Sequence, residues 1–302
     1  MPGYRTEEPR PEDRSRLVRA AARIGGSRYA SKTRRWLASA PGKVLYAALG
    51  RQVIGLVHLV PLSRDELWLE GMRIHSPVRG RGLGHRFARD QIAWARSRGY
   101  RWVRLATRSD NEIIRHVMTA EGFCESGPWW RMVGSPFPPS PTDSVKQASI
   151  DQLQSIWDFL NNHQDHLASG GLATSPQSIN RYQRLSPDLL LDRVRRGLVL
   201  LSDPPSPNGV LLLASEHKPG YLSVLQLVAA EPDTARGLLS AAHREAANLG
   251  RALAISIYRP DPLVVSAMQL QEARQIMRTP LQTWVVFSLD LATAGQGGAA
   301  GQ

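Results

Sequence analysis

Hydrophobic and polar positions alternate in short blocks along this chain, and the order of the blocks is similar in its two halves. In the first half, apolar runs at 44–49, 53–61 and 67–76 are bounded by turn residues, and a longer segment with helical spacing follows. Apolar runs of this length predict strands, and apolar positions three and four residues apart predict a helix. The pattern therefore predicts an α/β fold.

The remaining segments of the first half complete this arrangement. Glycines at 25 and 26 interrupt an otherwise helical pattern, and Gly99 follows the longer helical segment as a C-cap. The further predicted elements are a strand at 4–6, helices at 10–24, 31–39 and 87–98, and a strand at 102–106. The runs at 44–49 and 53–61 predict a hairpin around Gly50 and Arg51.

The run at 67–76 leads directly into a glycine-rich turn. A side-chain period of two predicts that Glu70, Met72 and Ile74 share one face of this strand, with Gly71 and Arg73 on the other. Glu70 is the acidic residue in this strand that lies nearest to the turn.

The turn at 79–84 reads RGRGLG and precedes a helix. Three glycines at alternate positions leave the backbone free to curl with its N–H groups pointing inward. The helix adds unpaired N–H groups and the positive end of its dipole, so the segment predicts a pyrophosphate site. A plain turn is the alternative from these glycines alone. A dinucleotide fingerprint is disfavoured, because its third glycine would come one residue later.

The turn and its flanks resemble motif A of the GNAT superfamily, the acyl-CoA-dependent N-acyltransferases. Arg79, Gly82 and Gly84 fill the three fixed positions of that pattern, Arg/Gln-x-x-Gly-x-Gly/Ala. Asn111-Glu112 and Gly122-Phe123 match later landmarks of the family. The resemblance covers roughly residues 4–133 and implies a mixed, mainly antiparallel twisted sheet flanked by helices.

The resemblance also implies acetyl-CoA as co-substrate and assigns residues to it. The implied cofactor-binding residues are Ile74, His75, Arg79, Gly80, Arg81, Gly82, Leu83, Gly84, His85 and Asn111. The backbone near Ile74 would pair with the pantetheine arm, and the glycine-rich turn would hold the pyrophosphate. For Asn111, a simple helix N-cap is the alternative role.

Glu70 is the predicted catalytic residue. A primary amine is protonated at neutral pH, and only the neutral amine attacks a thioester, so the reaction needs a base. Glutamates on this strand often serve so in the resembled family, whereas structural pairing of Glu70 with Arg73 is the alternative. The family's usual tyrosine acid is replaced by Met118, and His116 points about 200° away on a helix.

The second half repeats the order of elements without the glycine-rich turn. Predicted helices cover 150–162, 188–196, 234–249 and a segment from Asp261, and predicted strands cover 198–202, 210–215, 221–229, 252–258 and 283–291. Where the first half has its glycines, the second has Glu231, Pro232 and Asp233, which disfavour a phosphate. We therefore expect a second, degenerate GNAT-like domain that does not bind CoA.

These segments define an expected domain organisation. A catalytic domain is expected at 1–134, a proline-rich linker at 135–143, the degenerate domain at 144–292 and a tail at 293–302. The 302 residues are enough for two domains of ordinary size.

The positive charge is confined to the first half. Residues 1–140 hold 25 Lys and Arg against 12 Asp and Glu, a net +13, whereas residues 141–302 hold 13 against 14, a net −1. A positively charged entrance to the predicted site would attract the phosphates of CoA. Nucleic acid is the competing explanation, although the arginines are scattered over every element rather than arrayed on one helix.

Other site types find little support. Cys124 is the one cysteine, and His163 and His166 are too few ligands for a metal, so we expect no metal. No apolar run reaches the roughly 18 residues of a membrane helix, and a cytoplasmic location is expected. The oligomeric state is not predicted.

The sequence at 70–74, EGMRI, suggests the acceptor. It resembles Glu-Gly-Leu-Arg-Val in the histidine N-acetyltransferase group and many bacterial relatives, which implies a small amino-acid-like amine rather than a protein lysine. The predicted function is therefore acetyl transfer to such an amine. An acyl-CoA sensor without turnover is the first alternative, since the tyrosine is absent, and a nucleic-acid-binding protein is the second.

Overall fold

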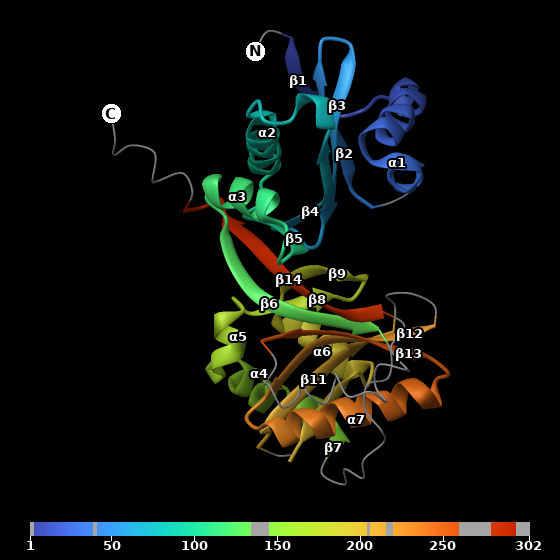
Figure 1. The fold of residues 1–302 in the computed structure, drawn as a ribbon. Coiled ribbons are helices and arrows are strands. Elements are labelled where there is room, and N and C mark those ends of the chain that lie inside the picture. Colours follow the sequence, from blue (N-terminus) through green and yellow to red (C-terminus); the bar gives the residue numbers. More distant parts are fainter. Residues whose placement is uncertain are drawn as a thin grey trace. The chain divides into compact units, whose positions relative to one another are not determined.

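The chain is described by a computed structural model that covers residues 3–38, 41–133, 145–203, 206–215, 220–259 and 279–293. It divides into two compact units that do not follow the chain in order. The first unit is Met1–Leu105, Asn111–Glu125 and Phe287–Gln302, and the second is Ala106–Asp110 and Ser126–Val286. Figure 1 shows the helices and strands of both units.

Helices and strands alternate along the chain. The helices are α1 (Arg14–Ala38), α2 (Leu83–Ser97), α3 (Glu112–Ala120), α4 (Leu153–Asn162), α5 (Gln164–Ala168), α6 (Pro187–Arg195) and α7 (Pro232–Asn248). The strands are β1 (Tyr4–Glu7), β2 (Lys43–Leu49), β3 (Gln52–Pro61), β4 (Glu66–Ile74), β5 (Trp102–Arg108), β6 (Cys124–Val133), β7 (Val145–Gln147), β8 (Leu172–Ser175), β9 (Ser178–Arg184), β10 (Val199–Ser202), β11 (Gly209–Ala214), β12 (Tyr221–Ala229), β13 (Ala252–Tyr258) and β14 (Thr279–Asp290).

In the first unit the strands follow the order β1-β2-β3-β4-β5, and the C-terminal end of β14 lies beside β5. Strands β1 to β4 are antiparallel, and β5 runs parallel to β4. Helix α1 covers one face of this sheet and α2 the other (Figure 1). The predicted break in the first helical segment is confirmed, because Gly26 inside α1 has a φ of 78° and is not helical.

A β-bulge in β4 corrects the predicted side-chain alternation. His58 pairs with Glu70 and Leu56 with Arg73, so one residue of β3 lies opposite two of β4. Gly71 takes up the extra residue with a φ of 68°. Since the bulge shifts the period by one, Glu70 and Arg73 face α1 whereas Ile74 faces α2, and the expectation that Glu70 and Ile74 share a face is wrong.

A buried ion pair joins the beginnings of β4 and β5. Glu66 Oε1 lies 2.7 Å from Arg104 Nη1, and both side chains are almost completely buried. Arg104 Nε donates to Ser288 Oγ at 3.2 Å, so the same guanidinium also bonds the end of β14. Charges at this depth are fixed in position by their partners.

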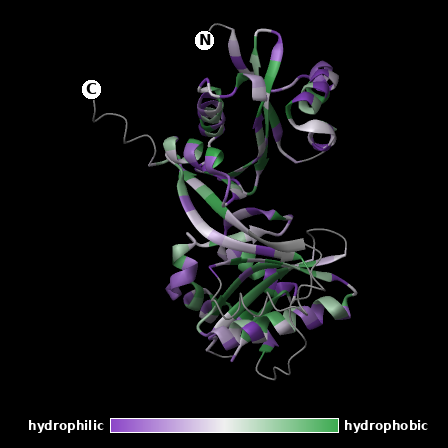
Figure 2. Cartoon of the chain, in the orientation of Figure 1, coloured by the Kyte–Doolittle hydropathy of each residue, from purple (hydrophilic) through white to green (hydrophobic). Residues whose placement is uncertain are grey.

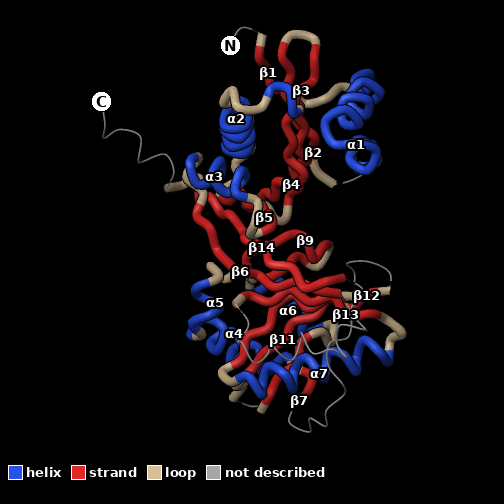
Figure 3. The backbone as a smooth tube through the Cα atoms, viewed as in Figure 1, coloured by secondary structure: helices blue, strands red, loops and turns tan. Residues whose placement is uncertain are grey.

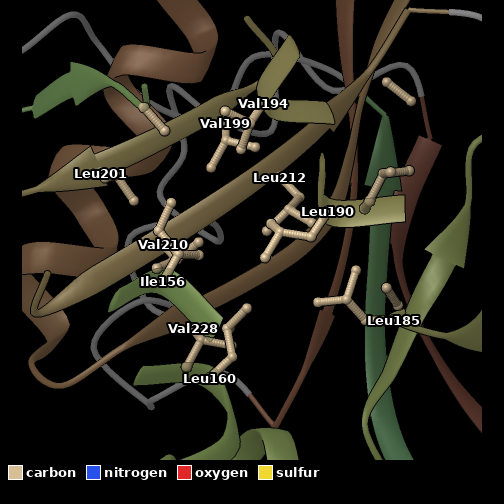
Figure 4. Packing of buried hydrophobic residues seen from close by; sticks show 14 residues of the cluster. Ile156, Leu160, Leu185, Leu190, Val194, Val199, Leu201, Val210, Leu212 and Val228 are labelled. Carbon is tan, nitrogen blue, oxygen red and sulfur yellow. The ribbon is translucent and has the colours of Figure 1, made fainter. Parts of the chain in front are cut away.

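In the second unit the order is β6-β13-β12-β11-β10-β7, with the N-terminal part of β14 beside β6. A separate two-stranded sheet is formed by β8 and β9. Helix α7 packs on one face of the large sheet, through residues such as Leu238 and Leu211. Helices α4 and α6 pack on the other, and Figure 4 shows Ile156, Leu190 and Leu212 in that cluster. The strands are largely hydrophobic and the helices around them more polar (Figure 2).

Most predicted elements are confirmed. Strands β12 and β13 have the predicted bounds, and the other described helices and strands that were expected differ mainly at their ends. The β8-β9 hairpin was not predicted, because its sequence is polar and does not alternate. The predicted linker, the helix from Asp261 and all of the tail after Thr293 lie outside the described residues.

Candidate active site

The C-terminal end of β4 is fixed to its neighbours before the glycine-rich turn begins. The amide of His75 donates to the carbonyl of Ile54 at 2.7 Å, and a short 3-10 turn, Ser76–Val78, follows. Arg79 Nε donates back to the carbonyl of Ile74 at 3.0 Å. The arginine of the predicted motif therefore anchors the start of the turn, and Arg81 beside it is exposed.

The turn is open and lies at the start of α2 (tan in Figure 3). Gly80 and Gly82 have φ of 75° and 72°, and a Cβ at either would meet nothing within 4 Å. Gly84 is also unobstructed, but it lies in the first turn of α2, since that helix begins at Leu83 and not at residue 87 as predicted. Two glycines rather than three therefore need the left-handed conformation.

The first amides of this segment have no backbone acceptor among the described residues. Within the described part of the chain, the backbone N–H groups from Gly80 to His85 donate no hydrogen bond to another backbone group, whereas Arg86 N–H donates to Gly82 O. Successive unpaired amides at a helix N-terminus favour an anion. The geometry therefore suits the phosphate site that the sequence predicts.

Glu70 is held by two ring nitrogens. Its Oε1 accepts a hydrogen bond from Trp36 Nε1 at 3.0 Å and lies 3.0 Å from His58 Nδ1. The His58 side chain is completely buried, and the Glu70 side chain is 15% exposed. The Trp36 and His58 rings stack, with centroids 4.9 Å apart. Glu70 is thus fixed in orientation and still reachable from solvent.

The far nitrogen of His58 is a buried atom with no hydrogen-bond partner within the described residues. Gly42 approaches closely on that side, since a Cβ there would lie 2.1 Å from the Leu59 carbonyl oxygen and 3.1 Å from His58 Nε2. Only glycine therefore fits beside the ring. The single contact that orients the imidazole by hydrogen bonding is the one to Glu70, among the residues that the structure describes.

Aromatic rings and cations from α1 and β4 surround this group. The Tyr29 hydroxyl donates to the carbonyl of Gly71 at 2.7 Å and lies 3.1 Å from the carbonyl oxygen of Leu56, so it contacts both strands at the bulge. Burial raises the pKa of Tyr29, although Arg73 opposes the shift, so the hydroxyl stays a donor at neutral pH. Arg73 Cζ lies 4.8 Å from the Tyr29 centroid and Lys32 Nζ 4.9 Å from the Trp36 centroid.

The other predicted cofactor residues have partners within the first unit. His85 Nδ1 lies 2.9 Å from Glu121 Oε1, and Arg89 Nε donates to Glu121 Oε2 at 2.9 Å, so α2 is joined to the end of α3. Asn111 is the N-cap of α3 and accepts from the amide of Ile114 at 3.5 Å. Its N-cap role is therefore observed directly.

The position expected for the family's acid holds a buried thioether. Met118 is 1% exposed, whereas His116 two residues earlier is exposed. The His116 ring lies edge-on to the ring of His85, with centroids 5.9 Å apart. His116 and Met118 thus differ in environment as the helical geometry predicts.

His58 and Trp36 were missed in the sequence. Neither residue lies in a sequence motif. His58 lies next to Glu70 because of the register between β3 and β4, and Trp36 does so because of the way α1 folds. The isolated glycine inside the predicted strand was the one available signal, because a glycine in a strand often marks a bulge. The bulge brings His58 opposite Glu70.

Two negative findings apply to the described residues. None of the helices described is long and apolar enough to span a membrane. Among the same residues, no group of three or more His, Cys, Asp and Glu side chains is arranged to hold a metal ion.

Comparison with known proteins assigns the fold. Residues 12–123 match the sequence model of the acetyltransferase (GNAT) family. The chain is 30% identical over 106 residues to N-acetyltransferase 8F1 of Rattus norvegicus, which is 32% of this chain and 48% of the rat protein. The match thus spans about half the length of that relative. The match to the family model assigns residues 12–123 to the acetyltransferase (GNAT) family.

Solved structures extend the fold comparison to nearly the whole chain. A GCN5-related N-acetyltransferase from Sphaerobacter thermophilus has a TM-score of 0.55 and 13% identity, and the alignment covers 96% of each chain. One from Kribbella flavida has a TM-score of 0.45 and 16% identity, covering 96% of this chain and 72% of that one. The first likeness concerns the fold alone.

Proposed function

We propose that this protein transfers an acetyl group from acetyl-CoA to a primary amine of a small amino-acid-like molecule. The observation that carries this proposal is the oriented carboxylate of Glu70, held by Trp36 and His58 on the strand that leads into the open amides of residues 80–85. Acetyl-CoA is the donor that the GNAT family uses. The reaction needs a base for the amine and a binding site for the phosphates of CoA. Here the base lies on β4 and the phosphate site on the turn that follows it.

The reaction proceeds by direct attack in a ternary complex. Glu70 takes a proton from the bound ammonium group, directly or through one water, and the neutral nitrogen attacks the thioester carbonyl. The C–N bond forms, and the nitrogen of the tetrahedral intermediate loses its second proton to water as the C–S bond breaks. CoA leaves as a thiolate that takes a proton from water. Backbone N–H groups stabilise the tetrahedral oxyanion, and binding both substrates together supplies much of the rate.

The turn at 79–84 and the end of β4 hold the donor in this proposal. The amides of Gly80, Gly82 and their neighbours bind the pyrophosphate, and the backbone at Ile74 pairs with the pantetheine. His75, Arg81 and His85 line the same end of the strand and helix. Asn111 acts through its cap on α3, which keeps the helix start in place.

Positive charge beside Glu70 supports an acceptor that carries a carboxylate. Arg73 shares the α1 side of the sheet with Glu70, and Lys32 lies over the Trp36 ring that contacts Glu70. A carboxylate near the reacting amine would interact with these cations, whereas a plain polyamine would be repelled by them. An α-amino acid has both groups.

The second unit has a different part in this proposal. Its segment Ala230–Asp233 replaces the glycines with two acids and a proline, so we propose a degenerate GNAT-like domain that does not bind CoA. Pro232 has no N–H to offer, and Glu231 is the N-cap of α7.

Thiol release from acetyl-CoA tests the proposal. The protein is assayed against free amino acids, polyamines, aminoglycosides and a lysine-rich peptide, with acetyl-CoA binding measured in parallel. We expect turnover on one or a few free amino acids and none on the lysine-rich peptide. Binding of acetyl-CoA without thiol release on any amine would contradict the proposed function.

A substitution at His58 tests how Glu70 is held. In His58→Phe a ring still fills the buried site and stacks on Trp36, but the contact to Glu70 is lost. A hydrogen bond to a charged group contributes about 1.5–3 kcal/mol, so we expect kcat to fall about tenfold or more, with an unchanged KM for acetyl-CoA. Steady-state kinetics measures both.

Tyr46→Phe is the matched control for this variant. It removes one polar atom from another buried ring of the same unit, whose hydroxyl bonds Glu7 rather than Glu70. Its kcat should stay within about twofold of the parent. Equal losses in the two variants would mean that His58 acts only through general stability.

Met118 favours a second candidate function, an acyl-CoA sensor. A buried thioether cannot protonate the leaving thiolate, and a protein that only binds acyl-CoA needs no such donor. The assay above separates the two candidates, because a sensor binds acetyl-CoA and releases no thiol.

A further inference from the structure

A cavity of about 660 Å³ lies in the second unit, where strands β12 and β13 end. These two strands are parallel but pair only over Tyr221–Ser223 and Ala252–Ala254. Beyond that point β12 stays paired with β11, and β13 with β6, so the two strands separate. Ligands of open α/β sheets bind at the carboxyl ends of such strands.

The same strand geometry occurs in the first unit. Strands β4 and β5 are parallel and also pair over three residues only, Glu66–Trp68 with Trp102–Arg104. In both units a long helix follows the first strand of the pair, α2 after β4 and α7 after β12. The cavity thus occupies the position in the second unit that corresponds to the proposed donor site in the first.

The inner part of this opening is filled by the β8-β9 hairpin. The Thr174 hydroxyl of β8 lies 3.2 Å from the carbonyl oxygen of Val224 and 3.0 Å from that of Leu225, just beyond the last residue of β12 that pairs with β13. The fully buried Tyr182 hydroxyl lies 2.9 Å from Ser256 Oγ on β13. The cavity lies farther along the two strands, beside Leu227 and Ala229 of β12 and Ile257 and Tyr258 of β13.

The cavity is lined by charged side chains of both signs, and the excess of acidic ones disfavours a phosphate. Asp165, from the start of α5, and Glu231, at the N-cap of α7, are acidic, and Arg259 at the end of β13 is basic. Two carboxylates repel a polyanion, whereas one guanidinium disfavours a simple cation. A molecule with an ammonium group and a carboxylate matches both.

The polar groups are held in place by the protein. His163 Nδ1 accepts from the amide of Asp165 at 3.2 Å, and His163 Nε2 lies 3.2 Å from the Ala229 carbonyl oxygen, so both ring nitrogens have a partner. Arg259 Nε donates to the Gly127 carbonyl at 2.9 Å, and its guanidinium lies 5.4 Å from the Tyr258 ring centroid. A site with fixed groups loses less entropy on binding.

We propose that this cavity binds a free α-amino acid, with its ammonium group at Asp165 and Glu231 and its carboxylate at Arg259. The apolar floor, formed by Leu227 and Ile257 among others, accepts the side chain. The binding site is separate from Glu70 and does not depend on acetyl transfer. The second unit thereby gains a ligand of its own in place of CoA.

Isothermal titration of the full chain with the free L-α-amino acids tests the proposal. The tightest binder is then compared with its N-acetyl form, which lacks the ammonium group, and its carboxamide, which lacks the carboxylate. We expect each modified form to bind at least about tenfold more weakly, because each loses one of the two charged contacts. Equal affinity of the three forms would overturn the proposal.

Charge-removing variants locate the site. Glu231→Gln and Arg259→Gln should each weaken binding about tenfold, and both side chains are exposed, so the core is left intact. Glu245→Gln, an exposed residue on the same helix, is the matched control and should bind as the parent does. Parental affinity in both cavity variants would overturn the proposal.

A variant of the first unit separates this site from the acceptor site. Glu70→Gln weakens any binding of the amino acid as acceptor in the first unit, whereas a binding step that Glu231→Gln and Arg259→Gln weaken should remain in it. Loss of binding in Glu70→Gln, with retention in Glu231→Gln, would assign the amino acid to the first unit and overturn the proposal. This experiment measures binding and not turnover, so its result does not depend on whether the protein transfers an acetyl group.

Discussion

Glu70→Gln is expected to lower kcat by about 10²- to 10⁴-fold, the range typical of a lost general base. The amide has nearly the same shape as the carboxylate and can still accept from Trp36 Nε1, so the fold and the acetyl-CoA affinity should be retained. Stopped assays of thiol release and titration with acetyl-CoA measure the two quantities. Glu112→Gln, an exposed change at the start of α3, is the control and should keep full activity.

The pH dependence of the variant gives an independent check. Without a base, the rate follows the fraction of neutral amine, which rises about tenfold per pH unit below the pKa of the amine. The rate of Glu70→Gln should therefore rise with pH until the pH reaches the pKa of the acceptor's ammonium group, and then level off. Activity within threefold of the parent at pH 7 would show that Glu70 is not the base.

Gly82→Trp is expected to weaken acetyl-CoA binding by about 100-fold or more. A Cβ added at Gly82 would have no described protein atom within 4 Å, so the indole has room but would cover the amides of the turn. The φ of 72° adds a backbone cost of about 1–2 kcal/mol for any L residue. Isothermal titration with acetyl-CoA measures the loss.

Gly99→Trp is a matched control for this variant. Gly99 follows the C-terminal end of the same helix, has a φ of 78° and also has no atom within 4 Å of an added Cβ. The two variants therefore have a similar backbone cost and differ in which end of α2 they cover. Unchanged acetyl-CoA affinity in Gly82→Trp, or equal losses in both, would exclude the turn as the phosphate site.

Local features of this fold could be predicted from the sequence. The kink at Gly26 and the bounds of β12 and β13 follow from glycine placement and uninterrupted apolar runs, which act within a few neighbouring residues. The turn before α2 was also predicted, although α2 begins four residues earlier, because Leu83 buries its side chain and starts the helix.

Features that depend on long-range pairing were not predicted. The partner of Glu70 is His58 because of the register between β3 and β4, and that register depends on the bulge at Gly71. The end of β14 lies beside β5, which comes far earlier in the chain, and no local pattern encodes such a pairing. Polar residues of β8 and β9 fit a buried opening that exists only in the folded unit.

The contribution of β14 to the first unit has a consequence for biosynthesis. The first unit needs Phe287 and the residues after it, and Arg101 bonds both Asp290 and the amide of Leu291. At about 5–20 residues per second, the ribosome needs roughly 8–30 s to extend the chain from Glu125 to Phe287. During that interval the nascent first unit has an unpaired edge at β5, and the sheet that carries Glu70 is completed only after the last residues of the second unit have been made.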